Sequence, residues 1–77
     1  MFKFHKYGLT FYFYCSKVAR TLNGEYYFFE CNIEKEGKIV KKGLMYSHSF
    51  DINKPNASIC DQMVESFKNE GVIDDLI

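Results

Sequence analysis

Three cysteines and two histidines are the side chains of this 77-residue chain best suited to nucleophilic or metal chemistry. A tetrahedral Cys3His zinc site would need the following four of them: Cys15, Cys31, His48 and Cys60. None stands in a Cys-x-x-Cys pair, and an odd number of cysteines does not suit a disulfide framework. We therefore expect reduced, buried thiols, with no metal and no other cofactor, and keep the zinc site as the alternative.

Cys60 has a second interpretation, as a catalytic nucleophile. A thiolate is favoured in the first turn of a helix, and His48 lies upstream as a base. The neighbours Ile59 and Met63, however, place Cys60 on the apolar stripe of that helix, where a thiol is buried and inert. The five glycines are scattered and form no phosphate-binding loop. We predict that the protein is not an enzyme.

Two blocks consist only of aromatic residues, 11–14 and 26–29. Successive side chains of a strand point to opposite faces, so each block places rings on both faces of its sheet. The side chains predicted for the face away from the core include Tyr12, Tyr14, Tyr26, Phe28 and Met45, with Thr10, Glu30, Ile39 and Lys41 around them. Exposed tyrosines of this kind are typical of an interface. The competing interpretation is that another segment of the chain folds over this face.

Charge is distributed unevenly along a chain whose formal net charge is zero. Residues 1–54 hold nine basic and five acidic side chains, whereas residues 55–77 hold one and five. The zero net charge argues against strong non-specific binding to nucleic acid. A local basic cluster follows the second aromatic block, and it supplies three further candidates for contact with a partner: Lys38, Lys41 and Lys42.

The elements that position these residues are three or four strands and one helix. Strands are predicted over about 2–16, 25–33 and 38–50, and a helix over about 58–70. Residues 2–16 fit one long strand bent at Gly8 better than two strands, and residues 17–25 form a connection with an Asn-Gly turn. In the third strand Val40, Leu44 and Tyr46 share the core phase. Lys42 shares it too, which indicates either a bulge near Gly43 or a Lys42 side chain that snorkels at the sheet edge.

The predicted helix has an apolar stripe formed by Ile59, Cys60, Met63, Val64 and Phe67. Ser58 is the better N-cap, with Asn53 as the alternative, and Gly71 suits the position that follows the helix. The last apolar residues should turn back onto the core. The fold class is therefore α+β, an antiparallel β-meander packed on one C-terminal helix in a two-layer single domain of residues 1–77. No stretch approaches the length of a membrane span, and we expect a cytoplasmic protein.

Small size, paired strands, one helix and split charge make the chain similar in style to phage-encoded inhibitors of host defence, including anti-CRISPR proteins. No single motif carries this resemblance. It implies a non-catalytic module that binds a larger protein or a ribonucleoprotein complex through Tyr12, Tyr14, Tyr26 and Phe28. A homodimer formed through the same aromatic face is compatible with this hypothesis.

The alternative function is binding of single-stranded nucleic acid or RNA. Rings on a sheet can stack on unpaired bases while lysines of the 35–42 hairpin contact phosphates. The order of three strands and a helix also looks like a double-stranded-RNA-binding domain. The chain departs from that pattern because the first helix is missing, and the last helix begins with Asn56, Ser58 and Asp61 where lysines are expected.

Overall fold

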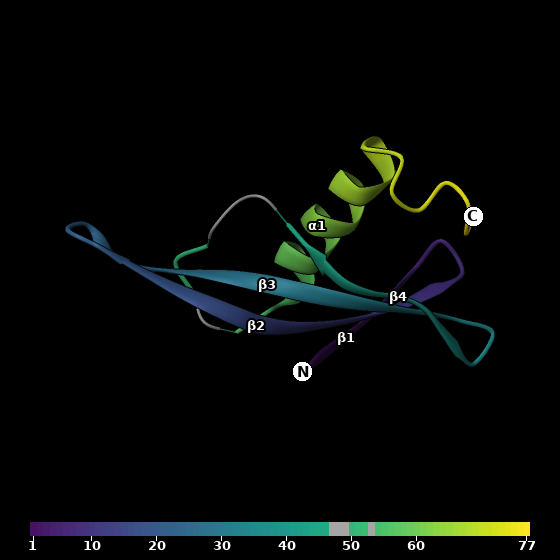
Figure 1. Ribbon diagram of the computed structural model, residues 1–77, viewed down its shortest axis with the longest axis horizontal. Coiled ribbons are helices and arrows are strands. Elements are labelled where there is room, and N and C mark those ends of the chain that lie inside the picture. Colours follow the sequence, from purple (N-terminus) through teal and green to yellow (C-terminus); the bar gives the residue numbers. More distant parts are fainter. Residues whose placement is uncertain (47–49, 53) are drawn as a thin grey trace.

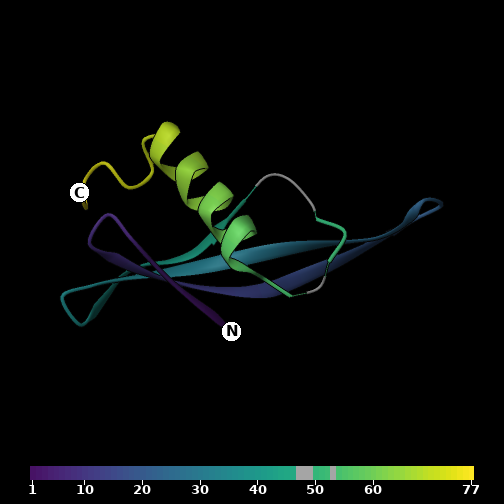
Figure 2. The ribbon, with the colours of Figure 1, turned by 180° about the vertical axis from the view of Figure 1, so that it is seen from behind.

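Four strands and one helix make up the computed structural model, which describes residues 1–46, 50–52 and 54–77 (Figure 1). The strands form one antiparallel sheet in the order of the chain, and the helix covers one face of it (Figures 1 and 2). This arrangement confirms the predicted α+β fold. The elements are β1 (Phe2–Lys6), β2 (Leu9–Thr21), β3 (Gly24–Lys35), β4 (Lys38–Met45) and α1 (Ala57–Asn69).

Residues 2–13 form a hairpin, so the prediction of a single bent strand over 2–16 is wrong. β1 and β2 pair antiparallel, from Phe2 opposite Phe13 to Lys6 opposite Leu9. The turn between them consists of Tyr7 and Gly8, which have φ angles of 55° and 73°. Two successive residues with positive φ match the twist of a two-residue hairpin. The sequence signal of the turn was weak because Tyr rarely adopts this conformation.

The hairpin of β2 and β3 is longer than predicted. Residues 17–21 continue β2, and the connection is reduced to a turn at Leu22 and Asn23, between Thr21 and Gly24. The predicted connection over 17–25 is therefore wrong. These residues lack a buried face, so the alternation that identifies a half-buried strand is absent there. A register shift between Cys15 and Lys17 leaves Ser16 as an extra residue in β2. We call residues 16–28 the arm; it extends beyond the rest of the molecule (Figure 1).

β4 ends at Met45 and not at residue 50. Phe50 returns as an isolated bridge to Tyr27, and residues 47–49 lie outside the described part. The predicted bulge is confirmed, because the β3–β4 register shifts between Cys31 and Ile33, opposite Lys42 and Gly43. Gly43 has a φ of 69°, and its N–H donates to Asn32 Oδ1 at 3.0 Å. A second shift between Ile33 and Glu34 leaves Val40 unpaired and exposed, so its predicted core position is wrong.

The core lies between the helix and one face of the sheet. Its buried residues confirm the predicted core phase of β2 and β3 and the helical stripe; they are Leu9, Phe11, Phe13, Phe29, Cys31, Ile33, Tyr46, Cys60, Met63, Val64, Phe67 and Ile73. Cys15, predicted in the same phase, is exposed because it lies beyond the end of β1 and beside the bulge.

The ends of α1 are both capped by local hydrogen bonds. Asn56 Oδ1 accepts from the Ile59 N–H at 2.9 Å, so Asn56 is the N-cap and the prediction of Ser58, with Asn53 as its alternative, is wrong. Gly71 follows the helix with a φ of 76°, as predicted. The Val72 N–H donates to Phe67 O at 2.9 Å, which closes a Schellman motif and turns the last residues back onto the core. Among the described residues, no helix has the length and apolar character needed to cross a membrane.

Candidate interaction surface

The face of the sheet opposite α1 carries the predicted aromatic cluster, and we call it the outer face. Phe11, Phe13 and Phe29 are buried beneath the helix, so their neighbours along each strand point the other way. The register places Tyr14 opposite Glu30 and Phe28 opposite Lys17. The four predicted aromatic residues of this face are all partly exposed: Tyr12, Tyr14, Tyr26 and Phe28. In the described part of the chain, neither the helix nor another strand covers this face (Figures 1 and 2).

Two tyrosine hydroxyls of the outer face are bound by carboxylates of β3. Tyr14 donates to Glu30 Oε2 at 2.5 Å, and Tyr12 donates to Glu34 Oε1 at 3.1 Å. The hydrogen bond to Glu30, and then partial desolvation, raise the pKa of Tyr14; desolvation, and then the bond to Glu34, raise the pKa of Tyr12. Both phenols are therefore neutral at physiological pH, and their rings are held in fixed positions before any partner binds.

Two lysines approach the rings of the outer face, and the sequence analysis did not single them out. Lys3 Nζ lies 5.5 Å from the centre of the Tyr12 ring, and Lys17 Nζ lies 5.7 Å from that of Phe28. Both distances are within the range of a cation–π contact. The alternation of Lys3 with Phe2 and Phe4 indicates that Lys3 points to the outer face. Lys17 reaches that face only because the bulge at Ser16 changes the phase of β2.

The predicted lysine cluster does not join the aromatic residues. Lys41 lies opposite the buried Ile33, on the helix side of the sheet, because it lies between the two register shifts of β4, where the alternation is reversed. The prediction that Lys41 borders the outer face is therefore wrong. Its Nζ donates to Val72 O and pairs with Asp75 Oδ1 at 3.1 Å. The hydrogen bond from Lys41 lowers the pKa of Asp75.

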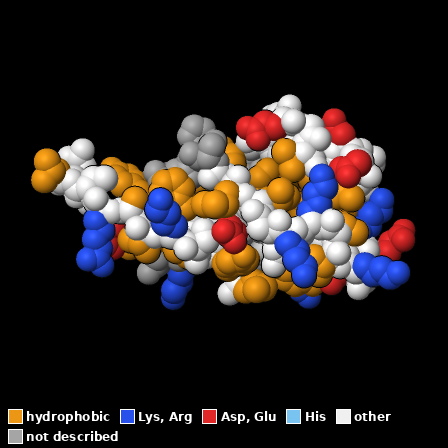
Figure 3. Space-filling model, viewed as in Figure 1, with side chains coloured by type: hydrophobic (Ala, Val, Ile, Leu, Met, Phe, Trp, Pro, Cys, Tyr) orange, Lys and Arg blue, Asp and Glu red, His pale blue; other side chains and the backbone are white. Residues whose placement is uncertain are grey.

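The other lysines of the 35–42 hairpin do not form the predicted cluster either. Lys35 Nζ donates to Leu76 O at 2.7 Å, so this lysine, like Lys41, holds the C-terminal segment. Lys38 lies opposite Lys35, at the end of the hairpin, and Lys42 lies in the bulge; both are exposed. Acidic side chains gather over the helix end of the molecule, and many lysines and arginines over the sheet (Figure 3).

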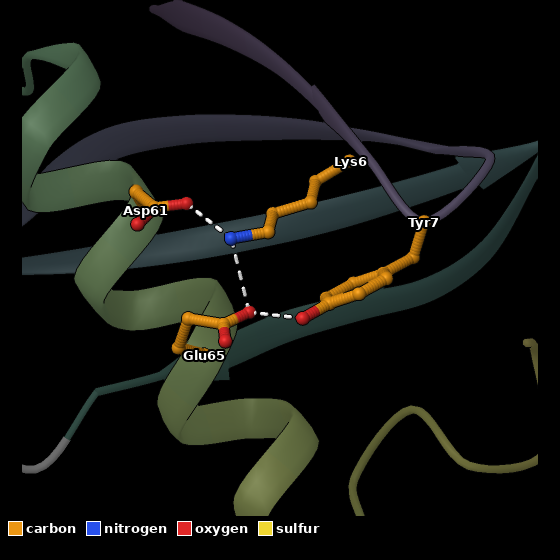
Figure 4. A network of polar contacts seen from close by, with 4 residues as sticks. All are labelled: Lys6, Tyr7, Asp61 and Glu65. Carbon is orange, nitrogen blue, oxygen red and sulfur yellow. Dashed lines mark hydrogen bonds and ion pairs between the residues drawn. The ribbon is translucent and has the colours of Figure 1, made fainter.

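A polar network that the sequence analysis missed attaches α1 to the first hairpin (Figure 4). Lys6 Nζ lies 2.5 Å from Asp61 Oδ1 and 3.1 Å from Glu65 Oε2, and the Tyr7 hydroxyl donates to Glu65. Hydrogen bonds to Asp61 and then Glu65 raise the pKa of Lys6 to about 12. The hydrogen bond from Tyr7, followed in size by the one from Lys6, lowers the pKa of Glu65. The network attaches the helix to the turn of the first hairpin, on the face of the sheet opposite the outer face.

Two of the three thiols are buried and poorly ionised. Burial raises the pKa of both Cys31 and Cys60 to about 12, which suppresses the thiolate form. Within residues 1–46, 50–52 and 54–77, no group of three or more metal-binding side chains comes together, and no pocket is present. His48, the fourth residue of the alternative zinc site, lies outside the described residues.

Comparison with known proteins adds no further information about this surface. No protein-family model matches the chain, and neither the curated proteins nor the solved structures contain a match.

Proposed function

We propose that the chain is a non-catalytic protein-binding module and that its outer face is the contact surface. The observation that carries this proposal is a row of partly exposed aromatic side chains on a sheet face that no described helix or strand covers. Tyrosine contributes a large apolar area at low conformational cost, and interfaces are enriched in it for that reason. The rings already held by Glu30 and Glu34 lose little further freedom when they bind.

The contact residues we propose are Tyr12, Tyr14, Tyr26 and Phe28, with Lys3 and Lys17 beside them. Lys38 and Lys42 are exposed on another part of the sheet, and there they can steer the approach of an acidic partner. Lys41 is not part of this proposal, because it is bound to the C-terminal segment. The partner class we propose is a larger protein or ribonucleoprotein complex, bound and blocked in the manner of a phage or mobile-element inhibitor of host defence.

The charge of the outer face favours a protein over a nucleic acid. Glu30 and Glu34 lie among the rings, where their carboxylates repel phosphate groups. The two lysines of this face lie over rings, and the exposed lysines of the 35–42 hairpin are not grouped with the aromatic residues. The two carboxylates offset the two lysines of this face, so stacked bases would find no net positive charge there for their phosphates.

Substitution of two central side chains tests this proposal. The variant carries Tyr14→Ser and Phe28→Ser, neither of which touches the buried core. A matched control carries Gln62→Ser and Asn69→Ser, at two exposed positions of the helix. The protein captured from lysate of the cells in which the chain is naturally made should be lost with the outer-face variant and kept with the control. Equal capture by both folded variants would contradict the proposal, as would salt-dependent binding of a single-stranded oligonucleotide by the native chain.

A further inference from the structure

The arm has a free backbone edge along β2. β1 pairs with β2 only from Leu9 to Phe13, and in the described residues no other strand follows on that side. β3 occupies the opposite side of β2 as far as Thr21. The strand past the bulge, residues 17–21, is therefore paired on one side and open on the other.

The hydrogen bonds of Tyr27 show which residues of the arm point toward the open edge. Tyr27 exchanges both backbone bonds with Phe50, at 2.6 and 3.0 Å, on the side of β3 away from β2. Its partner in the ladder, Val18, is therefore in a non-hydrogen-bonded pair, because opposed residues of antiparallel strands alternate between the two types. The N–H and C=O groups of Val18, and by the same alternation those of Arg20, point to the open edge.

Side chains along this edge are compatible with contact to a like strand. Val18 is an exposed apolar residue, with 45% of its surface accessible, and Leu22 at the end of the arm is fully exposed. The cations of the arm are already engaged within the chain. Arg20 Nε pairs with Glu25 Oε1 at 3.1 Å, and Lys17 Nζ lies over the Phe28 ring.

We propose that residues 17–21 pair antiparallel with the same residues of a second copy of this chain, about a two-fold axis at Ala19. Val18 of each copy then lies opposite Arg20 of the other, and all four edge-pointing N–H groups meet carbonyl groups. Lys17 lies opposite Thr21 of the second copy, so no two like charges are directly opposed. The contact is isologous, as expected for a C2 dimer, and it joins the two sheets into one.

This dimer uses the edge of the arm and leaves the outer face accessible, so it is independent of the protein-binding function proposed above. In the joined sheet, Ala19 of the two copies form the central pair on the outer-face side, and Tyr26 flanks them on each β3. The aromatic surface of one copy therefore continues into that of the other.

Removal of one backbone donor tests whether the edge is used. Val18→Pro deletes an N–H that makes no bond within the chain, and proline is tolerated at an open edge. Val18→Thr keeps the N–H and is the matched control. In sedimentation at rising concentration, the native chain and the Thr variant should reach twice the monomer mass, and the Pro variant should stay a monomer. A native chain that is monomeric throughout, or a dimer that persists in a folded Pro variant, would overturn the proposal.

A cysteine at the proposed axis tests the register. Ala19→Cys, in a Cys15→Ser background, opposes two cysteines in a non-hydrogen-bonded pair with Cα atoms about 4.5 Å apart, a separation that a disulfide spans. Lys17→Cys in the same background is the control, because its two copies lie four residues apart along the strands, about 13 Å. Mild oxidation should give a covalent dimer of the first variant alone. Equal cross-linking of both, or none in the first, would overturn the register. The outer-face variant described above should dimerise normally, so failure of one proposal does not imply failure of the other.

Discussion

The reactivity of the three cysteines tests the packing of the helix on the sheet without a known partner. Cys31 in β3 and Cys60 in α1 are fully buried, whereas Cys15 in β2 is exposed. The reactive species is the thiolate. For a thiol with the pKa of about 12 that burial gives Cys31 and Cys60, the thiolate fraction at pH 8 is about 10⁻⁴; for a freely exposed thiol, with a pKa of about 8.5, it is about one quarter.

We therefore expect one fast and two slow cysteines in the folded protein. The thiolate fractions differ roughly 2,000-fold, and the greater nucleophilicity of a more basic thiolate offsets part of this difference. Alkylation of Cys31 and Cys60 should therefore be roughly 50-fold slower than that of an exposed thiol, before steric exclusion is counted. The assay is alkylation by iodoacetamide at pH 8, followed by mass spectrometry at increasing times. A single adduct should form quickly, and three should form in denaturant.

Two variants make the result specific. Cys15→Ser should abolish the fast adduct, and Cys60→Ser should leave it unchanged. If two or three adducts formed quickly in the folded native chain, the helix could not cover β3 as described, and the reasoning that places the outer face on the opposite side would fail with it.

The remaining predictions concern the elements that hold the helix and the sheet in place. Asn56→Ala should lower the stability by about 1 kcal/mol, or roughly 4–8 °C in Tm, whereas Ser58→Ala should have little effect; equal losses would contradict the assigned N-cap. Gly43→Ala meets no atom within 4 Å but must adopt a left-handed φ, so a loss of about 1–2 kcal/mol in chemical denaturation is expected, and an unchanged midpoint would argue against the bulge. The pKa of Glu65 is lowered in the folded state, so its contribution is present above the unfolded pKa of about 4.3 and is lost as pH falls through the folded value. Thermal melts between about pH 5 and pH 3 should therefore fall less steeply for Glu65→Gln than for the native chain, and parallel curves would contradict the network.

Strong periodicity made the core predictable from the sequence. Leu9, Phe11 and Phe13 alternate with polar or amphipathic residues, and the helix repeats its apolar residues at a helical spacing, so burial on one face is implied by the pattern alone. The outer face followed from the same alternation. These are the segments in which a solvent-facing side and a core-facing side differ most in composition.

Other features depend on interactions that alternation does not encode. Within the arm, residues 17–21 have no buried face, so backbone pairing alone makes this segment a strand. Lys41 lies on the helix side because it stands between two bulges of β4, the first of which reverses the alternation and the second of which restores it. Only one of these bulges had a sequence signal, at Gly43. The attachment of the helix through Lys6 and Glu65 joins residues far apart in the chain, and no local pattern indicates such a pair.

Site-specific photo-crosslinking tests most directly whether the outer face is the binding surface. A benzophenone side chain at position 28 lies on that face, and the same group at position 62 lies on the exposed side of the helix. In lysate of the cells in which the protein is naturally made, we predict one covalent protein adduct from position 28 and none of that adduct from position 62. The same adduct from position 62, with none from position 28, would contradict the proposed function.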